Sequence, residues 1–151
     1  MMGLTFHFLV EVSVSLRKII FILFGIIVIQ FIILALLPWP DHIDYHESDR
    51  CNYYFYTDKN IKNAPRIFDS YYFSYDAPKD GLKERSSIIF LGGDIKLIKI
   101  YLEKLGYYVS DLGVVENNER EEYWFRTGGG DMFTLWYNSD DSTVILTKVS
   151  S

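Results

Sequence analysis

Residues 121–149 read EEYWFRTGGGDMFTLWYNSDDSTVILTKV and contain three segments rich in aromatic and β-branched residues. These segments, 121–127, 131–138 and 143–149, are separated by Gly-Gly-Gly and by Ser-Asp-Asp-Ser. Apolar and polar positions that alternate between such turn signals are typical of strands. The segment therefore predicts two consecutive hairpins of an antiparallel sheet.

The lengths of the two loops predict the register of these hairpins. A three-residue glycine loop pairs Phe125 with Phe133, and a four-residue loop after Asn138 pairs Trp136 with Ile145. One face of the sheet then carries Tyr123, Phe125, Phe133, Leu135, Tyr137, Val144 and Leu146. The other face carries Trp124, Met132, Trp136, Ile145 and Val149, with Thr134 and Thr147 between them. A slip of one residue would exchange the faces, because side chains alternate along a strand.

The second of these faces is unusually apolar for a surface exposed to water. One interpretation is that segments 53–57 and 71–75 cover it and that its tryptophans belong to the core. The other is that the face is partly open and binds a partner, since exposed apolar patches often mark interfaces. The expected partner-binding residues are then Trp124, Met132, Trp136 and Ile145.

On the N-terminal side of these hairpins, residues 95–105 predict a helix. Their apolar residues recur at helical spacing, Asp94 precedes them as an N-cap, and Gly106 follows them as a C-terminal stop. Further strands are expected at 53–57, 71–75, 87–91 and 107–115. The domain is therefore expected to be α+β, with a helix packed on a mainly antiparallel sheet.

Residues 19–37, IIFILFGIIVIQFIILALL, are uncharged, and 16 of the 19 are Ile, Leu, Phe or Val. At 1.5 Å per residue a helix of this length spans roughly 28 Å, close to the hydrocarbon thickness of a bilayer. A core helix of a soluble protein would show a polar stripe, and this segment has none. The sequence therefore predicts a transmembrane helix.

A cleaved signal peptide is the alternative to a membrane anchor. It would have a shorter apolar run and a cleavage site flanked by small residues. Here the run continues into Leu-Pro-Trp-Pro at 37–40, which offers no such site. We therefore expect an uncleaved anchor, with Trp39 at the level of the lipid headgroups.

Flanking charges predict the orientation of this helix. Arg17 and Lys18 lie at its N-terminal end, whereas residues 41–49 contain four carboxylates and no Lys or Arg. The positive-inside rule places the N-terminus in the cytoplasm and the C-terminal domain outside. Arg17, Lys18 and Trp39 are thus the expected membrane-anchoring residues.

Residues 1–16 show a different pattern, because apolar and polar residues alternate as in a strand. A lone strand would lack a partner for its backbone hydrogen bonds. Either this segment lies along the membrane interface, or translation begins further downstream and part of it is not made.

These features divide the chain into four parts and limit its partners. They are a cytoplasmic segment 1–18, a transmembrane helix 19–37, a juxtamembrane linker 38–52 and an extracytoplasmic domain 53–151. Residues 38–151 have 13 basic and 19 acidic side chains, a net charge of −6, which argues against nucleic-acid binding. The single cysteine, Cys51, excludes an internal disulfide.

The expected linker also contains the densest group of potential metal ligands, DHIDYHESDRC at 41–51. The spacing matches no ligand signature that we can identify, and we expect no metal and no cofactor. The histidines of this segment are the only ones outside the N-terminal region, so a histidine-based catalytic site would have to form here. We therefore expect the protein not to be an enzyme.

Two functional classes remain. In the first, the outer domain binds a protein partner, as an inhibitor or immunity-type protein or as a small subunit of an envelope complex. In the second, a metal-binding or enzymatic envelope protein uses the His42–Cys51 segment. The abundance of tyrosine and tryptophan and the absence of a catalytic motif favour the first class.

Overall fold

The computed structural model describes residues 3–36, 40–112 and 118–150, and the side chains of 17–34, 40–110 and 118–150. The chain separates into two compact units, Met1–Trp39 and Pro40–Ser151. Trp39, the expected aromatic membrane anchor, lies outside the described residues.

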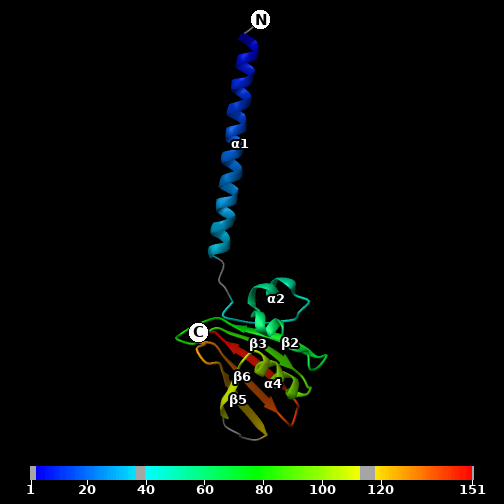
Figure 1. Cartoon of the computed structure of the whole chain (residues 1–151). Coiled ribbons are helices and arrows are strands. Elements are labelled where there is room, and N and C mark those ends of the chain that lie inside the picture. The colour runs from blue at the N-terminus through cyan, green and yellow to red at the C-terminus, as the bar shows by residue number, and fades with distance from the viewer. Residues whose placement is uncertain (1–2, 37–39, 113–117, 151) are drawn as a thin grey trace. The chain divides into compact units, whose positions relative to one another are not determined.

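The described part of the first unit is one helix, α1 (Gly3–Leu36), of 34 residues (Figure 1). Its segment Arg17–Leu34 has a mean hydropathy of 2.4, and none of that segment is buried. Large apolar side chains therefore surround this part of the helix instead of forming one stripe. By length and composition α1 can cross a membrane, and a signal sequence would have the same properties.

The strand-like alternation of residues 1–16 is a misleading signal, because residues 3–16 belong to α1. A helix forms its backbone hydrogen bonds within one segment, whereas a strand needs a neighbour. The segment continues directly into the apolar helix, so helical backbone bonds extend into it without a new nucleation step.

Among the described residues of the second unit, seven strands form one sheet in the order β1-β2-β3-β7-β6-β5-β4 (Figure 1). The strands are β1 (His42–Tyr45), β2 (Tyr71–Asp76), β3 (Arg85–Phe90), β4 (Tyr108–Leu112), β5 (Glu119–Phe125), β6 (Met132–Asn138) and β7 (Val144–Val149). All neighbouring pairs are antiparallel. The expected antiparallel sheet is confirmed, whereas the described residues of this unit contain three helices where one packed helix was expected.

Helix α4 (Ile95–Lys104) also forms where the sequence predicts a helix. The Asp94 carboxylate accepts a hydrogen bond of 2.9 Å from the Lys96 amide and caps the first turn. Gly106 follows the last turn with a φ of +82°, a conformation that favours glycine. Before the helix, Gly93 has a φ of +110°, and a Cβ atom there would lie 2.6 Å from the Ile67 carbonyl oxygen.

The strand expected at 53–57 is wrong, because these residues lie mostly in helix α2 (Arg50–Tyr56). The Asp49 carboxylate caps this helix by accepting from the Asn52 amide at 3.3 Å. Tyr53 packs on Phe73 of β2, with ring centroids 5.1 Å apart. Aromatic side chains thus fix a helix against the sheet instead of forming a strand of it. A shorter helix, α3 (Lys59–Lys62), follows.

The segment 38–52, expected as a linker, contributes to the folded unit. Its residues 42–45 form the edge strand β1, which pairs with β2 in the register His42↔Asp76 to Tyr45↔Phe73. The Tyr45 side chain is 4% exposed, and its hydroxyl lies 2.8 Å from the Thr57 hydroxyl. Burial raises the pKa of Tyr45 to about 12.

The register of the C-terminal hairpins agrees with the prediction at one loop and not at the other. Between β6 and β7, Trp136 pairs with Ile145 as expected. Between β5 and β6 the register is shifted by one residue, so that Trp124 pairs with Phe133. Residues 126–131 all belong to the connection between β5 and β6. In it, the Gly129 amide donates a hydrogen bond to the Arg126 carbonyl oxygen, and Gly128 has a positive φ. The shift exchanges the two faces of β5.

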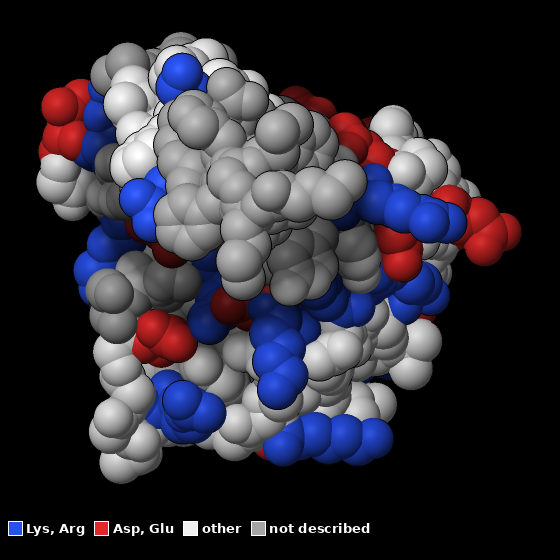
Figure 2. Space-filling view, turned by 90° about the horizontal axis from the view of Figure 1, so that it is seen from above, with Lys and Arg blue, Asp and Glu red and all other residues white. Residues whose placement is uncertain are grey.

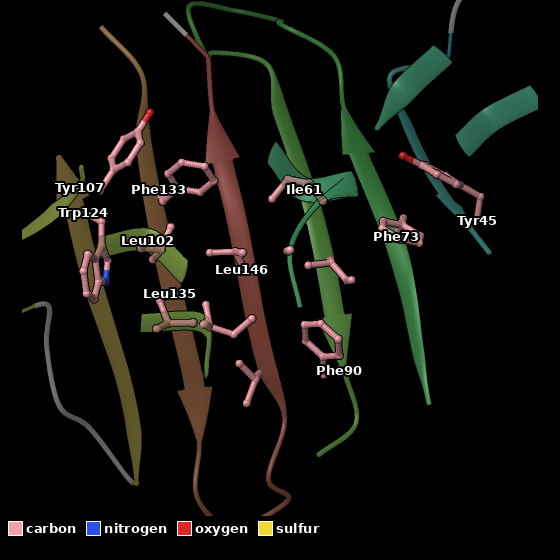
Figure 3. Packing of buried hydrophobic residues seen from close by; sticks show 14 residues of the cluster. Tyr45, Ile61, Phe73, Phe90, Leu102, Tyr107, Trp124, Phe133, Leu135 and Leu146 are labelled. Atoms are coloured by element: carbon pink, nitrogen blue, oxygen red, sulfur yellow. The ribbon is translucent and has the colours of Figure 1, made fainter. Parts of the chain in front are cut away.

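One apolar core lies between the sheet and helices α2, α3 and α4. Trp124, Phe133 and Leu135 of the sheet are at most 2% exposed, and Ile98 and Leu102 of α4 are fully buried beside them. Figure 3 shows this cluster, with side chains from both halves of the sheet directed to the same side. The helices thus cover one face of the sheet.

Three ion pairs border this core. Glu122 is 5% exposed, and it receives hydrogen bonds from Lys99 of α4 at 2.5 Å and from the Trp124 indole at 3.3 Å. Lys148 is 8% exposed, and its Nζ lies 2.9 Å from Asp58 Oδ2 and 3.2 Å from Asp131 Oδ2. The pairs of Glu122 with Lys99 and of Lys148 with Asp58 join the sheet to a helix or to its N-cap, whereas Asp131 lies in the connection between β5 and β6.

Candidate functional site

The opposite face of the sheet is not covered by helix α2, α3 or α4, because all three pack on the core side. We call it the open face. It comprises Ser87, Tyr123, Met132, Thr134, Trp136, Ile145, Thr147 and Val149. The register places Ser87, Thr147, Thr134 and Tyr123 in one row across β3, β7, β6 and β5.

A groove of about 320 Å³ crosses this face. Along β6, the small Thr134 lies between Met132 and Trp136, since every second residue of a strand faces the same side. The two large side chains form the walls, and the hydroxyl row forms the floor. Ser87 Oγ and Thr147 Oγ1 lie 2.9 Å apart in that floor.

Charged side chains stand at the edges of the groove. Glu121 accepts a hydrogen bond of 2.8 Å from the Tyr123 hydroxyl, which fixes both side chains. Asp76 and Arg85 face each other across β2 and β3. Arg85 is the single basic residue among the described residues that line the groove. The site therefore combines partly exposed aromatic side chains with hydroxyl groups and a carboxylate-rich edge.

The structure places three of the four predicted partner-binding residues on this face. Met132, Trp136 and Ile145 lie there together and are partly exposed. Trp124 lies in the core instead, because the register between β5 and β6 differs by one residue. Tyr123 lies on the open face in its place. Only the true length of the glycine-containing connection would have revealed this exchange.

The potential metal ligands of residues 41–51 are distributed over β1, the following turn and α2. His42 Nδ1 lies 2.6 Å from Asp76 Oδ1, and its Nε2 lies 3.4 Å from Asp44 Oδ1. The His46 ring contacts Tyr72 edge-on, with centroids 6.4 Å apart. Cys51 is exposed on the first turn of α2.

The surroundings of His42 favour its protonated form. The hydrogen bond to Asp76 raises its pKa above the ordinary value of 6.5, partial burial opposes this shift, and the charge of Asp44 adds to it. Within the residues that the structure describes, no three His, Cys, Asp or Glu side chains form a group able to hold a metal ion. That this segment holds no metal and no catalytic site stays a prediction, and metal analysis of the purified chain would test the first part of it.

Comparisons with protein-family models, with curated proteins and with solved structures found no match to this chain.

Proposed function

We propose that this chain is a single-pass membrane protein whose outer domain binds a protein partner through the open face. The observation that carries the proposal is the groove flanked by Met132 and Trp136. Its walls are partly exposed apolar side chains on a sheet face that α2, α3 and α4 leave uncovered. Such a domain suits an inhibitor or immunity-type protein, or a small subunit of an envelope complex.

The chemistry of the open face supports a protein as the partner. Tyrosine, tryptophan and methionine are enriched at protein interfaces, where they bury large areas with few rotatable bonds. Asp76 and Glu121 give the groove an acidic edge, and residues 38–151 have a net charge of −6. Charge complementarity then favours a partner with a basic patch.

Helix α1 supports the membrane anchor. Arg17–Leu34 is long and apolar enough to span a bilayer, and Arg17 and Lys18 lie at its N-terminal side. The positive-inside rule then favours a cytoplasmic N-terminus and an outer C-terminal domain. As an uncleaved anchor, α1 would hold the domain at the surface where it meets its partner.

The anchor and its orientation are tested by two measurements on the same cells. A reporter that is active only outside the cytoplasm, fused after Ser151, should be active. The full mass of the chain should be recovered from the membrane fraction. An inactive reporter would reverse the orientation, and a chain shortened after α1 would indicate a cleaved signal sequence.

The partner site is tested by a photo-crosslinking amino acid at Trp136. As a matched control, the same amino acid replaces Leu82, which is 62% exposed on the connection between β2 and β3. The variant at position 136 should form an adduct with one protein, and the variant at 82 should not. Equal adducts from both positions, or none from 136, would contradict the proposal.

A further inference from the structure

The charges of the outer domain are separated between its helices and its strands. Helices α2, α3 and α4 together contain six Lys or Arg and one Glu. The seven strands contain three Lys or Arg and six Asp or Glu. With the N-cap carboxylates Asp49, Asp58 and Asp94 counted, the helices and their caps hold six basic and four acidic side chains. A domain with an acidic total therefore has a moderately basic helical side. Figure 2 shows more blue than red along the lower part of the view.

Several of these basic side chains are available to an outside partner. Lys59, Lys96 and Lys104 are exposed, and no described carboxylate lies within ion-pair distance of them. Lys62 donates a hydrogen bond of 2.9 Å to the Tyr54 carbonyl oxygen, and its Nζ lies 5.3 Å from the centre of the Tyr54 ring. Its charge is thus held beside an aromatic side chain.

Large apolar side chains lie exposed on the same helices. Tyr54 and Phe55 of α2 are 72% and 70% exposed, and their rings contact each other edge-on. Leu97 and Ile100 of α4 are also about half exposed. Basic residues interleaved with exposed aromatic and aliphatic residues are typical of surfaces that lie on lipid headgroups.

We propose that this helical face docks on the anionic lipid headgroups of the membrane that α1 spans. The inference rests on the proposed membrane anchor. Only residues 37–39 lie in the sequence between α1 and the unit that begins at Pro40. An anchored domain therefore meets the lipid surface at a high effective concentration.

Charge complementarity selects the side of the domain that meets the lipid. The acidic strands would be repelled by anionic headgroups, whereas Lys59, Lys96 and Lys104 would be attracted. Tyr54 and Phe55 would enter the interfacial layer, which aromatic side chains favour. The open face lies on the opposite side of the sheet, so this docking leaves it accessible to a partner.

Cys51 provides a probe at this surface. It is the only cysteine of the chain, it is exposed, and Tyr54 and Phe55 follow it by three and four residues on the same side of α2. A dye sensitive to polarity, attached to Cys51 of the full chain, reports its surroundings in nanodiscs. The discs contain phosphatidylcholine alone or phosphatidylcholine mixed with phosphatidylglycerol.

We expect the dye emission to shift to the blue in the anionic discs, and spin-labelled lipid to quench it. Added salt should reduce both effects, because it screens the lysines. The double variant K96E/K104E should lose the shift. Its matched control, K79E/K83E, changes the net charge equally on the connection between β2 and β3, and it should keep the shift.

A second pair of variants tests the apolar contribution. L97S should reduce the shift, whereas L82S, at a side chain of similar exposure away from the helices, should not. Two results would overturn the docking for a chain that stays in the discs. One is equal emission in both kinds of disc, and the other is an equal loss of the blue shift in the test and control variants. A chain that leaves the discs would overturn the anchor and the docking together.

Discussion

Trp124 of β5 pairs with Phe133 of β6 on the core side of the sheet, while Trp136 lies on the opposite side. The two tryptophans therefore have different roles, although they are twelve residues apart in neighbouring strands. Trp124 is 2% exposed and its indole donates to Glu122. Trp136 forms a wall of the groove.

Truncation should distinguish these roles. Trp124→Ala should destabilise the domain by about 3–5 kcal/mol, because it leaves a cavity and removes the indole donor of a buried carboxylate. Trp136→Ala should cost about 1 kcal/mol, since its side chain is already partly exposed. Urea unfolding of both variants measures the difference. Equal losses of stability would contradict the assignment of the two faces.

Lys148 should stabilise the junction between β7 and the segment that precedes α3. Burial alone would lower its pKa, but the hydrogen bonds and charges of Asp58 and Asp131 raise it overall. Lys148→Met should therefore cost about 1–3 kcal/mol, because both carboxylates lose a charged donor. Lys83→Met, at an exposed position, is the control and should leave the thermal midpoint nearly unchanged.

His42 should contribute a small pH dependence to stability. Because its pKa is raised in the folded state, the contribution is complete below pH 6.5 and is lost as the pH rises through the raised pKa. Both partners are about half exposed, so solvent screening keeps the effect small. An NMR titration of the His42 ring measures the pKa, and Asp76→Asn should lower it. An unchanged value in that variant would exclude Asp76 as the main cause.

Gly93 should tolerate substitution less than Gly81 does. Both have a positive φ, so an alanine at either position adopts a left-handed conformation that costs about 1–3 kcal/mol. A Cβ at Gly81 meets open space, whereas one at Gly93 collides with the Ile67 carbonyl. Gly93→Ala should therefore lower the melting temperature more than Gly81→Ala. Similar melting temperatures would show that the 67–68 segment moves aside easily.

Helix α4 could be predicted from sequence because all of its signals lie in one short window. Its cap at Asp94, its helical period and the stop at Gly106 are local, and each agrees with the others. The register between β6 and β7 was predictable for the same reason, since a polar four-residue turn fixes it.

Helix α2 and the register of β5 depend on contacts distant in sequence. The Tyr-Tyr-Phe-Tyr run favours a strand by propensity, whereas the Asp49 cap and the packing of Tyr53 on Phe73 hold it as a helix against the sheet. The amino-acid composition of the connection between β5 and β6 does not determine at which residues the pairing of these two strands ends. A difference of one pairing step moved Trp124 from the expected partner site into the core.

The position of β1 has a mechanical consequence. It is the first strand after α1 in the chain, it is an edge strand of the sheet, and it pairs with β2 alone among the described strands. Tension between an anchored α1 and a partner held on the open face would therefore load the four paired positions of β1 before any other strand. The Asp41 carbonyl, bonded to the Ala77 amide, and the Asp41 carboxylate, paired with Lys79, would bear that tension first. We therefore expect β1 to be the first strand of this unit to yield under such tension.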